Sequence, residues 1–235
     1  MSRSLLRHSL FLGLILPVLF LAACQNREQV PDPSSEQYRE AVTSFYSSLA
    51  AIQAGSDVGA QEGLLRVTEL APGEPAAWAN LGLLALRRNE LEQAGEWLAR
   101  AAELAPDNAQ ILLLQARLAS NQGNFEQAIQ LLRQAIERDP TNIEARYALA
   151  QEIERQAGPE WEFEVQQLVD EMLATRPDNV ALQIESVRIA ARRGDRATLD
   201  RGVARLEEAS AAWPPEVREQ LDALRNVVAS GDLNQ

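Results

Sequence analysis

Few side chains in this sequence could take part in catalysis or metal binding. The 235 residues include one histidine, His8, and one cysteine, Cys24, and all 22 basic residues are arginine. The sequence therefore offers no lysine for a Schiff base and no group of histidines and cysteines for a soft metal site. Carboxylates, hydroxyls and guanidinium groups remain. We expect neither a cofactor nor a metal ion.

Pairs of neighbouring acids are the arrangement that most resembles a hydrolytic site. Glu152 and Glu154 form one such pair, and Glu207 and Glu208 form another. Two carboxylates can serve as acid and base in glycoside hydrolysis. Charged side chains on helices are more often simply solvated, so we predict that the protein is not an enzyme. A carboxylate-based hydrolase is the alternative.

The cysteine follows an apolar segment near the N-terminus. Arg3, Arg7 and His8 give the chain a basic start, and residues 10–20 are apolar but too few to cross a bilayer comfortably. Residues 21–24 read Leu-Ala-Ala-Cys, which resembles the lipobox of bacterial lipoproteins. The resemblance implies export, cleavage after Ala23 and acylation of Cys24. The alternative is an ordinary secretory signal with an incidental cysteine.

The lipoprotein resemblance also implies a location in the cell envelope. Gln25 follows the cysteine, and in lipoproteins of Gram-negative bacteria a residue other than aspartate there usually implies the outer membrane. We expect residues 1–23 to be a lipoprotein signal peptide and residues 24–36 to be the lipidated cysteine and a flexible tether. The folded domain would then face the periplasm. Two or three acyl chains give stable attachment, whereas one chain is marginal.

The rest of the chain repeats with a regular period. Prolines recur at positions 72, 106, 140, 177 and 214, which are 34, 34, 37 and 37 residues apart. Trp78 and Leu81 lie on one face of an expected first helix, and Ala94 and Leu98 lie on one face of a second. Hydrophobic residues make up 46% of the sequence but aromatic residues only 5%, which suits helices packed through small side chains.

Residues 75–108 resemble the tetratricopeptide repeat. Its 34-residue pattern is matched by Trp78, Leu81, Gly82, Ala94, Ala101 and Pro106, whereas Ala85 stands in place of its tyrosine and Leu98 in place of its phenylalanine. The resemblance implies an all-α fold, a solenoid of stacked helical hairpins, over residues 37–230. We expect repeats at approximately 41–74, 75–108, 109–142, 143–179 and 180–213, and a C-terminal capping helix at 214–230.

The fourth repeat contains an enlarged turn. Residues 158–164 read Gly-Pro-Glu-Trp-Glu-Phe-Glu and alternate acids with aromatic side chains. We favour the interpretation that Trp161 and Phe163 pack onto the next helix. An exposed loop that binds a partner is the alternative.

The resemblance to stacked hairpins predicts a concave side lined by the first helix of each hairpin. Positions one, five, eight and nine residues after that of Trp78 share a helical face, directed away from the packed face. These positions predict a partner-binding groove, which we assign to Leu83, Leu86, Arg87, Leu113, Arg117, Asn121, Tyr147, Gln151, Arg155, Arg188 and Arg192. Its leucines lie toward the N-terminal end and its arginines mostly toward the C-terminal end. The alternative is that these arginines pair with acids on neighbouring helices.

These patterns favour a protein-interaction scaffold or adaptor anchored in the bacterial cell envelope. Guanidinium groups bind carboxylates through paired hydrogen bonds, so the expected partner is a protein or peptide segment with acidic residues or a free C-terminus. The formal net charge of −12 argues against nucleic acid, and we expect no small-molecule substrate. An alternative is the N-terminal recognition module of a larger envelope protein that continues beyond residue 235.

Overall fold

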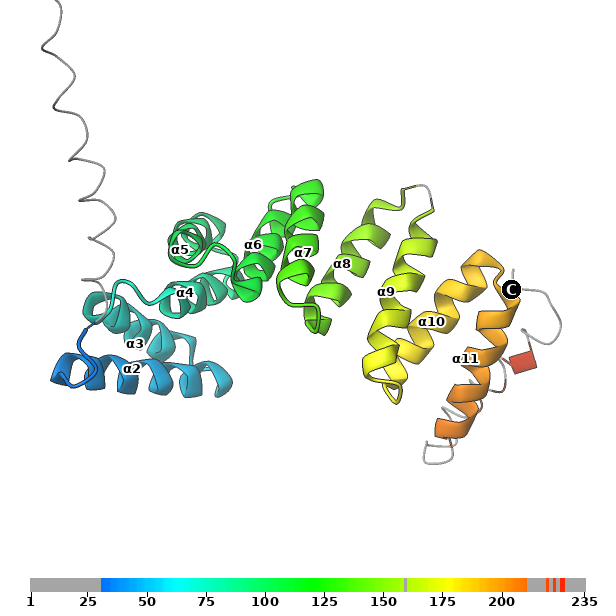
Figure 1. Cartoon of the computed structure of the whole chain (residues 1–235), viewed down its shortest axis with the longest axis horizontal. Helices are drawn as coiled ribbons and strands as arrows, with labels where there is room; N and C mark the ends of the chain where they lie inside the picture. The colour runs from blue at the N-terminus through cyan, green and yellow to red at the C-terminus, as the bar shows by residue number, and fades with distance from the viewer. Residues whose placement is uncertain (1–30, 159, 211–218, 220–221, 223–224, 227–235) are drawn as a thin grey trace, which may run out of the picture. The chain divides into compact units, whose positions relative to one another are not determined.

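The computed structural model describes residues 31–158 and 160–210, together with 219, 222, 225 and 226. The predicted signal peptide, Cys24 and most of the predicted capping helix lie outside these residues. The described part contains ten helices and no strand (Figure 1), which confirms the predicted all-α fold. The helices are α2 (Glu36–Gln53), α3 (Asp57–Leu70), α4 (Pro75–Arg87), α5 (Leu91–Leu104), α6 (Ala109–Asn121), α7 (Phe125–Arg138), α8 (Ile143–Gln156), α9 (Trp161–Thr175), α10 (Val180–Arg193) and α11 (Arg196–Ala209).

Asparagine caps set the start of the first helix in three of the hairpins. Asn108, Asn142 and Asn179 each accept a hydrogen bond, through the side-chain oxygen, from a backbone N–H in the first helical turn. Each lies two residues after one of the periodic prolines. Because proline interrupts a preceding helix and asparagine caps the following one, the proline period becomes the period of helix starts.

Residues with left-handed backbone form the turn inside each hairpin. Gly55, Gly123 and Gly194 have φ angles of 75°, 81° and 66°, and Asn89 occupies the equivalent position with a φ of 60°. Glycine adopts this conformation without steric cost, and asparagine adopts it more readily than most residues. In these four hairpins the two helices are therefore joined by a short turn of the same design.

The enlarged turn of the fourth hairpin departs from this design. Ala157 and Glu160 both have left-handed backbone, with φ angles of 43° and 60°, before α9 begins at Trp161. Trp161 is 9% exposed and belongs to the core, whereas Phe163 is 60% exposed. The packing interpretation therefore holds for Trp161 and is wrong for Phe163. Two residues along a helix correspond to a rotation of about 200°, which turns the second ring away from the core.

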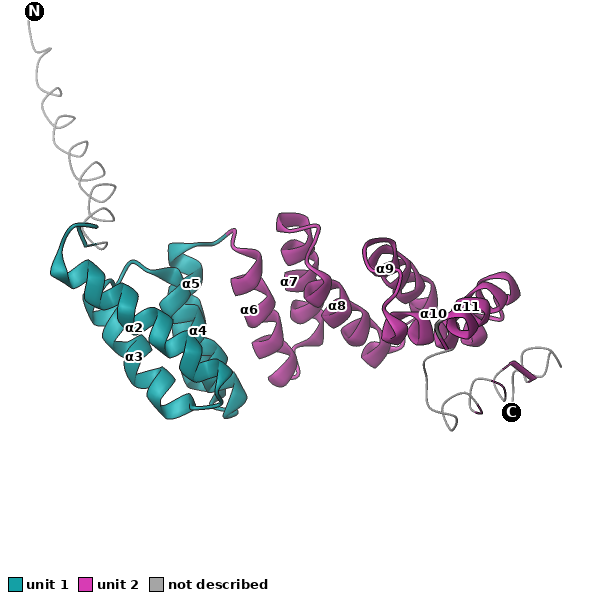
Figure 2. Cartoon of the chain, turned by 90° about the horizontal axis from the view of Figure 1, so that it is seen from below, with its two compact units in different colours: residues 1–106 teal, residues 107–235 magenta. Residues whose placement is uncertain are grey.

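The helices divide into two compact units (Figure 2). Unit 1 covers residues 1–106 and contains α2 to α5, and unit 2 covers residues 107–235 and contains α6 to α11. In unit 2, Arg225 is one of the described residues of the predicted capping segment, and its Nη1 lies 3.5 Å from Oε1 of Glu207 on α11. The apolar cores include Leu64, Leu81 and Leu84 in unit 1, and Leu132, Val165 and Met172 in unit 2, where a second cluster contains Val187, Leu199 and Leu206.

A glycine permits the close crossing of α4 and α5 in unit 1. A Cβ atom at Gly82 would lie 2.6 Å from both Cγ and Cδ2 of Leu98. Leu98 is only 1% exposed, so its side chain has little room to move away. The position that matches the glycine of the repeat pattern is therefore a point of direct contact between the two helices.

Adding one methyl group at this crossing should destabilise the protein. We expect Gly82→Ala to lower the free energy of unfolding by about 1–3 kcal/mol, because overpacking outweighs the better helix propensity of alanine. Thermal unfolding followed by circular dichroism measures the effect. Gly59→Ala on α3 is the matched control, because the nearest atom to its added Cβ would be Ser56 Oγ at 3.4 Å. A Gly82→Ala variant that melts no earlier than wild type would contradict the crossing.

Candidate protein-binding face

In unit 2, polar contacts join the first helix of each hairpin to the first helix of the next. These helices are α6, α8 and α10, and the contacts run from α6 to α8 and from α8 to α10. We use the term first-helix face of unit 2 for the residues at the predicted groove positions on these helices. They are Leu113, Arg117, Ser120, Asn121, Tyr147, Gln151, Glu154, Arg155, Ile184, Arg188, Ala191 and Arg192.

Arg188 is held between two carboxylates. Its Nη1 and Nη2 donate to the two oxygens of Glu154 on α8, each at 2.7 Å. Its Nε donates to Oε2 of Glu185 at 3.0 Å, and its Nη2 also donates to Oε1 of that residue. Hydrogen bonds to Glu185 and then to Glu154 raise the pKa of the guanidinium. The donor groups that a ligand would use are thus already occupied.

Arg155 belongs to a chain of contacts that ends at a buried acid. Its Nη1 donates to Ser120 Oγ at 3.1 Å, and that hydroxyl donates to Oε1 of Glu152 at 2.5 Å. Glu152 is 7% exposed, and its Oε2 has no partner in the described part of the chain. The guanidinium of Arg155 also lies 5.1 Å from the ring centroid of Phe125. Arg155 therefore helps to compensate a buried charge.

Arg117 and Arg192 are less constrained. Arg117 makes one exposed ion pair, in which its Nη2 lies 3.3 Å from Oε1 of Glu144. Exposed pairs of this kind contribute between 0 and about 1 kcal/mol to stability. The guanidinium of Arg192 lies 5.5 Å from the ring centroid of Trp161, and it makes no ion pair with any described residue. Neither arginine has to give up a buried ion pair in order to bind a ligand.

Leu113, which was expected to line the groove, is buried. Leu113 is 2% exposed and packs into the core of unit 2, so it offers almost no surface to a partner. Tyr147 and Ile184 stand on the same face and are 48% and 52% exposed. Asn121 and Gln151 are exposed beside them. The accessible apolar surface of this face therefore lies on α8 and α10.

The predicted groove residues of unit 1 all lie on α4. Leu86 is 7% exposed and Leu83 is half-buried, so their contribution as a binding surface is also smaller than expected. Arg87 is exposed, and its Nη1 lies 3.1 Å from Oδ1 of Asp57 on α3. The pattern of positions indicated the correct helix but not the depth at which each leucine is packed.

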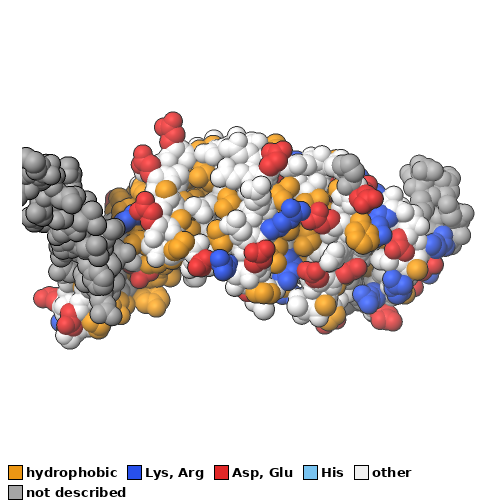
Figure 3. Space-filling model, turned by 45° about the horizontal axis from the view of Figure 1, so that its top comes forward, with side chains coloured by type: hydrophobic (Ala, Val, Ile, Leu, Met, Phe, Trp, Pro, Cys, Tyr) orange, Lys and Arg blue, Asp and Glu red, His pale blue; other side chains and the backbone are white. Residues whose placement is uncertain are grey.

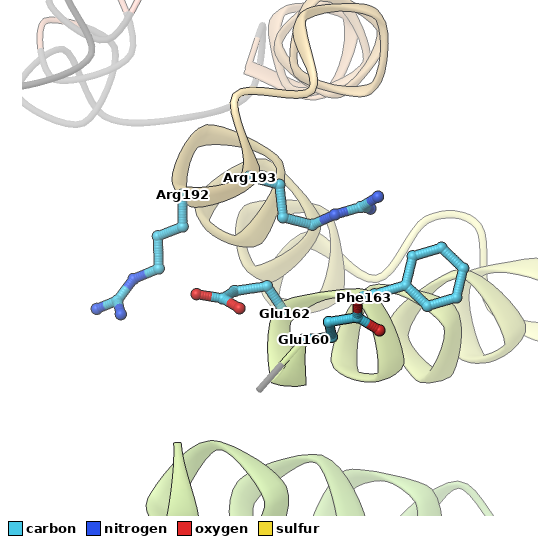
Figure 4. A pocket seen from close by; sticks show the side chains of 5 residues that line it. All are labelled: Glu160, Glu162, Phe163, Arg192 and Arg193. Carbon is cyan, nitrogen blue, oxygen red and sulfur yellow. The ribbon is translucent and has the colours of Figure 1, made fainter. Parts of the chain in front are cut away.

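A cavity of about 540 Å³ lies beside Arg192, between the start of α9 and the end of α10 (Figure 4). It is lined by Glu160, Glu162, Phe163, Arg192 and Arg193. The guanidinium of Arg193 lies 5.2 Å from the ring centroid of the exposed Phe163. Arg193 is not among the groove residues predicted from the sequence, and the cavity was not predicted. The alternation of acids and aromatic residues in the enlarged turn was the available signal.

Charges of both signs are mixed over the described surface. Figure 3 shows arginine and acidic side chains next to one another on the same face of the molecule. The carboxylates of the acid pair Glu152 and Glu154 contact Ser120 and Arg188 respectively, as the contacts above show. Among the described residues no group of histidines, cysteines and acids could hold a metal ion. The same part of the chain contains no helix long and apolar enough to span a membrane.

Comparison with known proteins identifies repeats in both units. A tetratricopeptide-repeat family model matches residues 59–109, and a second TPR-repeat model matches residues 121–152. A search of curated proteins by sequence gives no match.

Solved structures with similar folds cover most of the chain. The pilF protein of Pseudomonas aeruginosa is 16% identical with a TM-score of 0.66, over 85% of this chain and 92% of that one. Yeast Tom70 is 16% identical with a TM-score of 0.63, over 81% of this chain and 40% of that one. YrrB, described as a TPR protein with an unusual peptide-binding site, is 12% identical with a TM-score of 0.55, over 76% of this chain and 91% of that one.

At these identities the structural likeness establishes the fold alone. It agrees with the two family matches and with the recurring caps and turns of the helical hairpins. The chain therefore carries tetratricopeptide repeats and has the all-α solenoid fold of tetratricopeptide-repeat proteins.

Proposed function

We propose that the protein is a lipid-anchored scaffold of the bacterial cell envelope, which binds an extended segment of a partner protein. Tetratricopeptide-repeat proteins generally mediate protein–protein interaction. The observation that carries the proposal is the combination, on one face, of exposed apolar side chains and an arginine that pairs with no carboxylate of the described residues. Tyr147 and Ile184 supply the apolar surface, and Arg192 supplies the arginine.

The arginines of the first-helix face have different roles in this proposal. Arg188 and Arg155 hold neighbouring helices together, because their donors are engaged with Glu154, Glu185 and Ser120. Arg192, together with Arg117 once its exposed pair opens, is available to a partner. A guanidinium binds a carboxylate through two parallel hydrogen bonds, which gives both strength and orientation.

The surroundings of Arg192 restrict the form of that carboxylate. Glu160 and Glu162 line the cavity next to it, so a run of several acids would meet like charges. A single carboxylate, such as a free C-terminus, meets less repulsion. The partner segment would place this group at Arg192 and its apolar side chains over Ile184 and Tyr147.

The membrane anchor rests on the sequence at the N-terminus. Leu-Ala-Ala-Cys follows an apolar segment with a basic start, and Cys24 is the one cysteine in the chain. Acylation of Cys24 would hold the repeats at the periplasmic face of the outer membrane. The scaffold would then present its partner close to the membrane surface.

Replacing Cys24 should abolish lipid attachment. We expect Cys24→Ala to remain uncleaved and without the acyl chains, because the sulfur that carries the diacylglyceryl group is missing. Mass spectrometry of the protein purified from whole cells measures both changes. A free thiol on Cys24 in the wild-type protein would refute the anchor.

Charge reversal on the first-helix face should reduce partner capture. We expect Arg117→Glu and Arg192→Glu each to weaken binding about tenfold or more, because a hydrogen bond to a charged group contributes about 1.5–3 kcal/mol. The measurement is affinity capture from envelope membranes, followed by titration of the purified partner that is recovered.

Two arginines on second helices serve as matched controls for that experiment. Arg138 on α7 makes one exposed ion pair, with Asp107 at 2.7 Å, and so resembles Arg117. Arg205 on α11 is exposed and resembles Arg192. Arg138→Glu and Arg205→Glu should leave capture unchanged. Equal loss of capture in all four variants would indicate a general charge effect and would count against the proposed face.

Reversing Arg188 should affect stability instead of recognition. Arg188→Glu brings three carboxylates together, at positions 154, 185 and 188, so we expect a lower melting temperature than for Arg192→Glu. Thermal unfolding of both variants at pH 7 provides the measurement, and equal melting temperatures would contradict the role of Arg188.

A further inference from the structure

An apolar cavity of about 240 Å³ lies at the N-terminal end of unit 1. It is lined mainly by α2, with contributions from the end of α3 and the start of α4. Its lining includes Pro31, Tyr38, Val42, Phe45 and Tyr46. We use the term aromatic surface of α2 for the last four of these residues. The protein-binding face proposed above does not include them.

The aromatic surface of α2 is continuous and largely uncharged. Val42, Phe45 and Tyr46 lie four, seven and eight residues after Tyr38, so the four side chains share one side of the helix. Tyr46 is 66% exposed, and its ring meets that of Phe45 edge to face at 5.8 Å between centroids. Among the described lining residues only Glu74 is charged, and its carboxylate accepts a hydrogen bond from the backbone N–H of Ala76.

The position of this surface along the chain limits how far it can lie from the proposed anchor. Pro31 lines the cavity and follows Cys24 by seven residues. A fully extended chain of that length spans at most about 25 Å. If the acyl chains hold Cys24 at the headgroup region, Pro31 can lie no more than about 25 Å from that region.

We propose that the aromatic surface of α2 contacts the lipid interface of the membrane to which Cys24 is anchored. This inference rests on the lipid anchor of the proposed function. Tyrosine is enriched at membrane interfaces, because its ring is apolar and its hydroxyl remains hydrated. The chain carries a formal net charge of −12, so burial of apolar area and not attraction to anionic lipids would drive the contact.

The tether makes such a contact effective even when its intrinsic affinity is low. A surface held within reach of its target experiences a high effective concentration, so binding becomes an intramolecular event. A soluble protein partner has no such advantage at this site. The lipid interface is therefore the occupant that the length of the tether favours over a second protein.

A single fluorescent label can test the contact in the acylated full-length protein. In that form the sulfur of Cys24 is a thioether and does not react with thiol reagents, so Tyr46→Cys introduces the one reactive thiol. The label is an environment-sensitive fluorophore, and the protein is reconstituted into phosphatidylethanolamine–phosphatidylcholine vesicles. Ala99→Cys on α5 is the control, because Ala99 is exposed in the same unit and does not line the cavity.

We expect the label at position 46 to shift its emission to the blue in vesicles and to be quenched by brominated phosphatidylcholine. The label at position 99 should do neither. The shift should persist at high salt, because it depends on apolar contact. The blue shift should be lost in a variant that also carries Phe45→Ser and Val42→Ser. The circular dichroism spectrum of that variant confirms that it is folded.

Three results would overturn the inference. An unshifted label on acylated protein would refute the membrane contact and leave the anchor intact. A shift that needs no vesicles and grows with protein concentration would assign the surface to a second copy of the chain. A mass spectrum of the same sample that shows no acyl group would refute the anchor, and the inference with it.

Discussion

A single helical hairpin cannot cover its own apolar side, and the whole structure depends on a neighbour doing so. In unit 2 the largest apolar cluster includes Leu132 of α7, Leu149 of α8 and Val169 of α9, so it belongs to no single hairpin. Burial of this kind requires that helices approach closely. Glycines at two crossings meet that need, since a Cβ at Gly202 would lie 2.5 Å from Cγ2 of Val187, much as one at Gly82 would meet Leu98.

The fold could be predicted because several local signals repeat with one period. Proline, a capping asparagine and a left-handed turn residue recur in step, and each acts on the backbone within a few residues. The starts of α6 and α8 follow directly from Asn108 and Asn142. These signals act locally and do not depend on the neighbouring hairpin, so the fold could be predicted from the sequence alone.

The candidate binding face was less accessible to the same reasoning. Helical spacing gives the direction of a side chain but not how far the next helix covers it, and Leu113 is buried for that reason. One partner of Arg188, Glu185, lies only three residues before it, but the other, Glu154, precedes it by 34 residues. The second contact therefore depends on how α8 and α10 lie in space. The exposure of Phe163 likewise depends on where α9 begins after the enlarged turn.

Arginines that look alike in sequence thus divide into two kinds. Arg188 and Arg155 satisfy acids that are partly or wholly buried, so removing either would leave a carboxylate without compensation. Arg192 stacks on Trp161, which keeps its guanidinium ordered and its donors available. Preorganisation of this kind lowers the entropy lost when a ligand binds.

The helix α10 has two different sides, and this affects how unit 2 opens. Leu182 and Ile189 belong to the large cluster shared with α8 and α9, whereas Val187 and Ala190 belong to the smaller cluster shared with α11. The link from α10 to α8 through Arg188 is only partly buried and therefore weakens with ionic strength. Opening of the hairpin α10–α11 as one unit would break the contacts of Leu182 and Ile189 with the large cluster and keep those between Val187, Ala190 and α11. Its amide protons would exchange with solvent through a partial opening that leaves the hairpins before it folded.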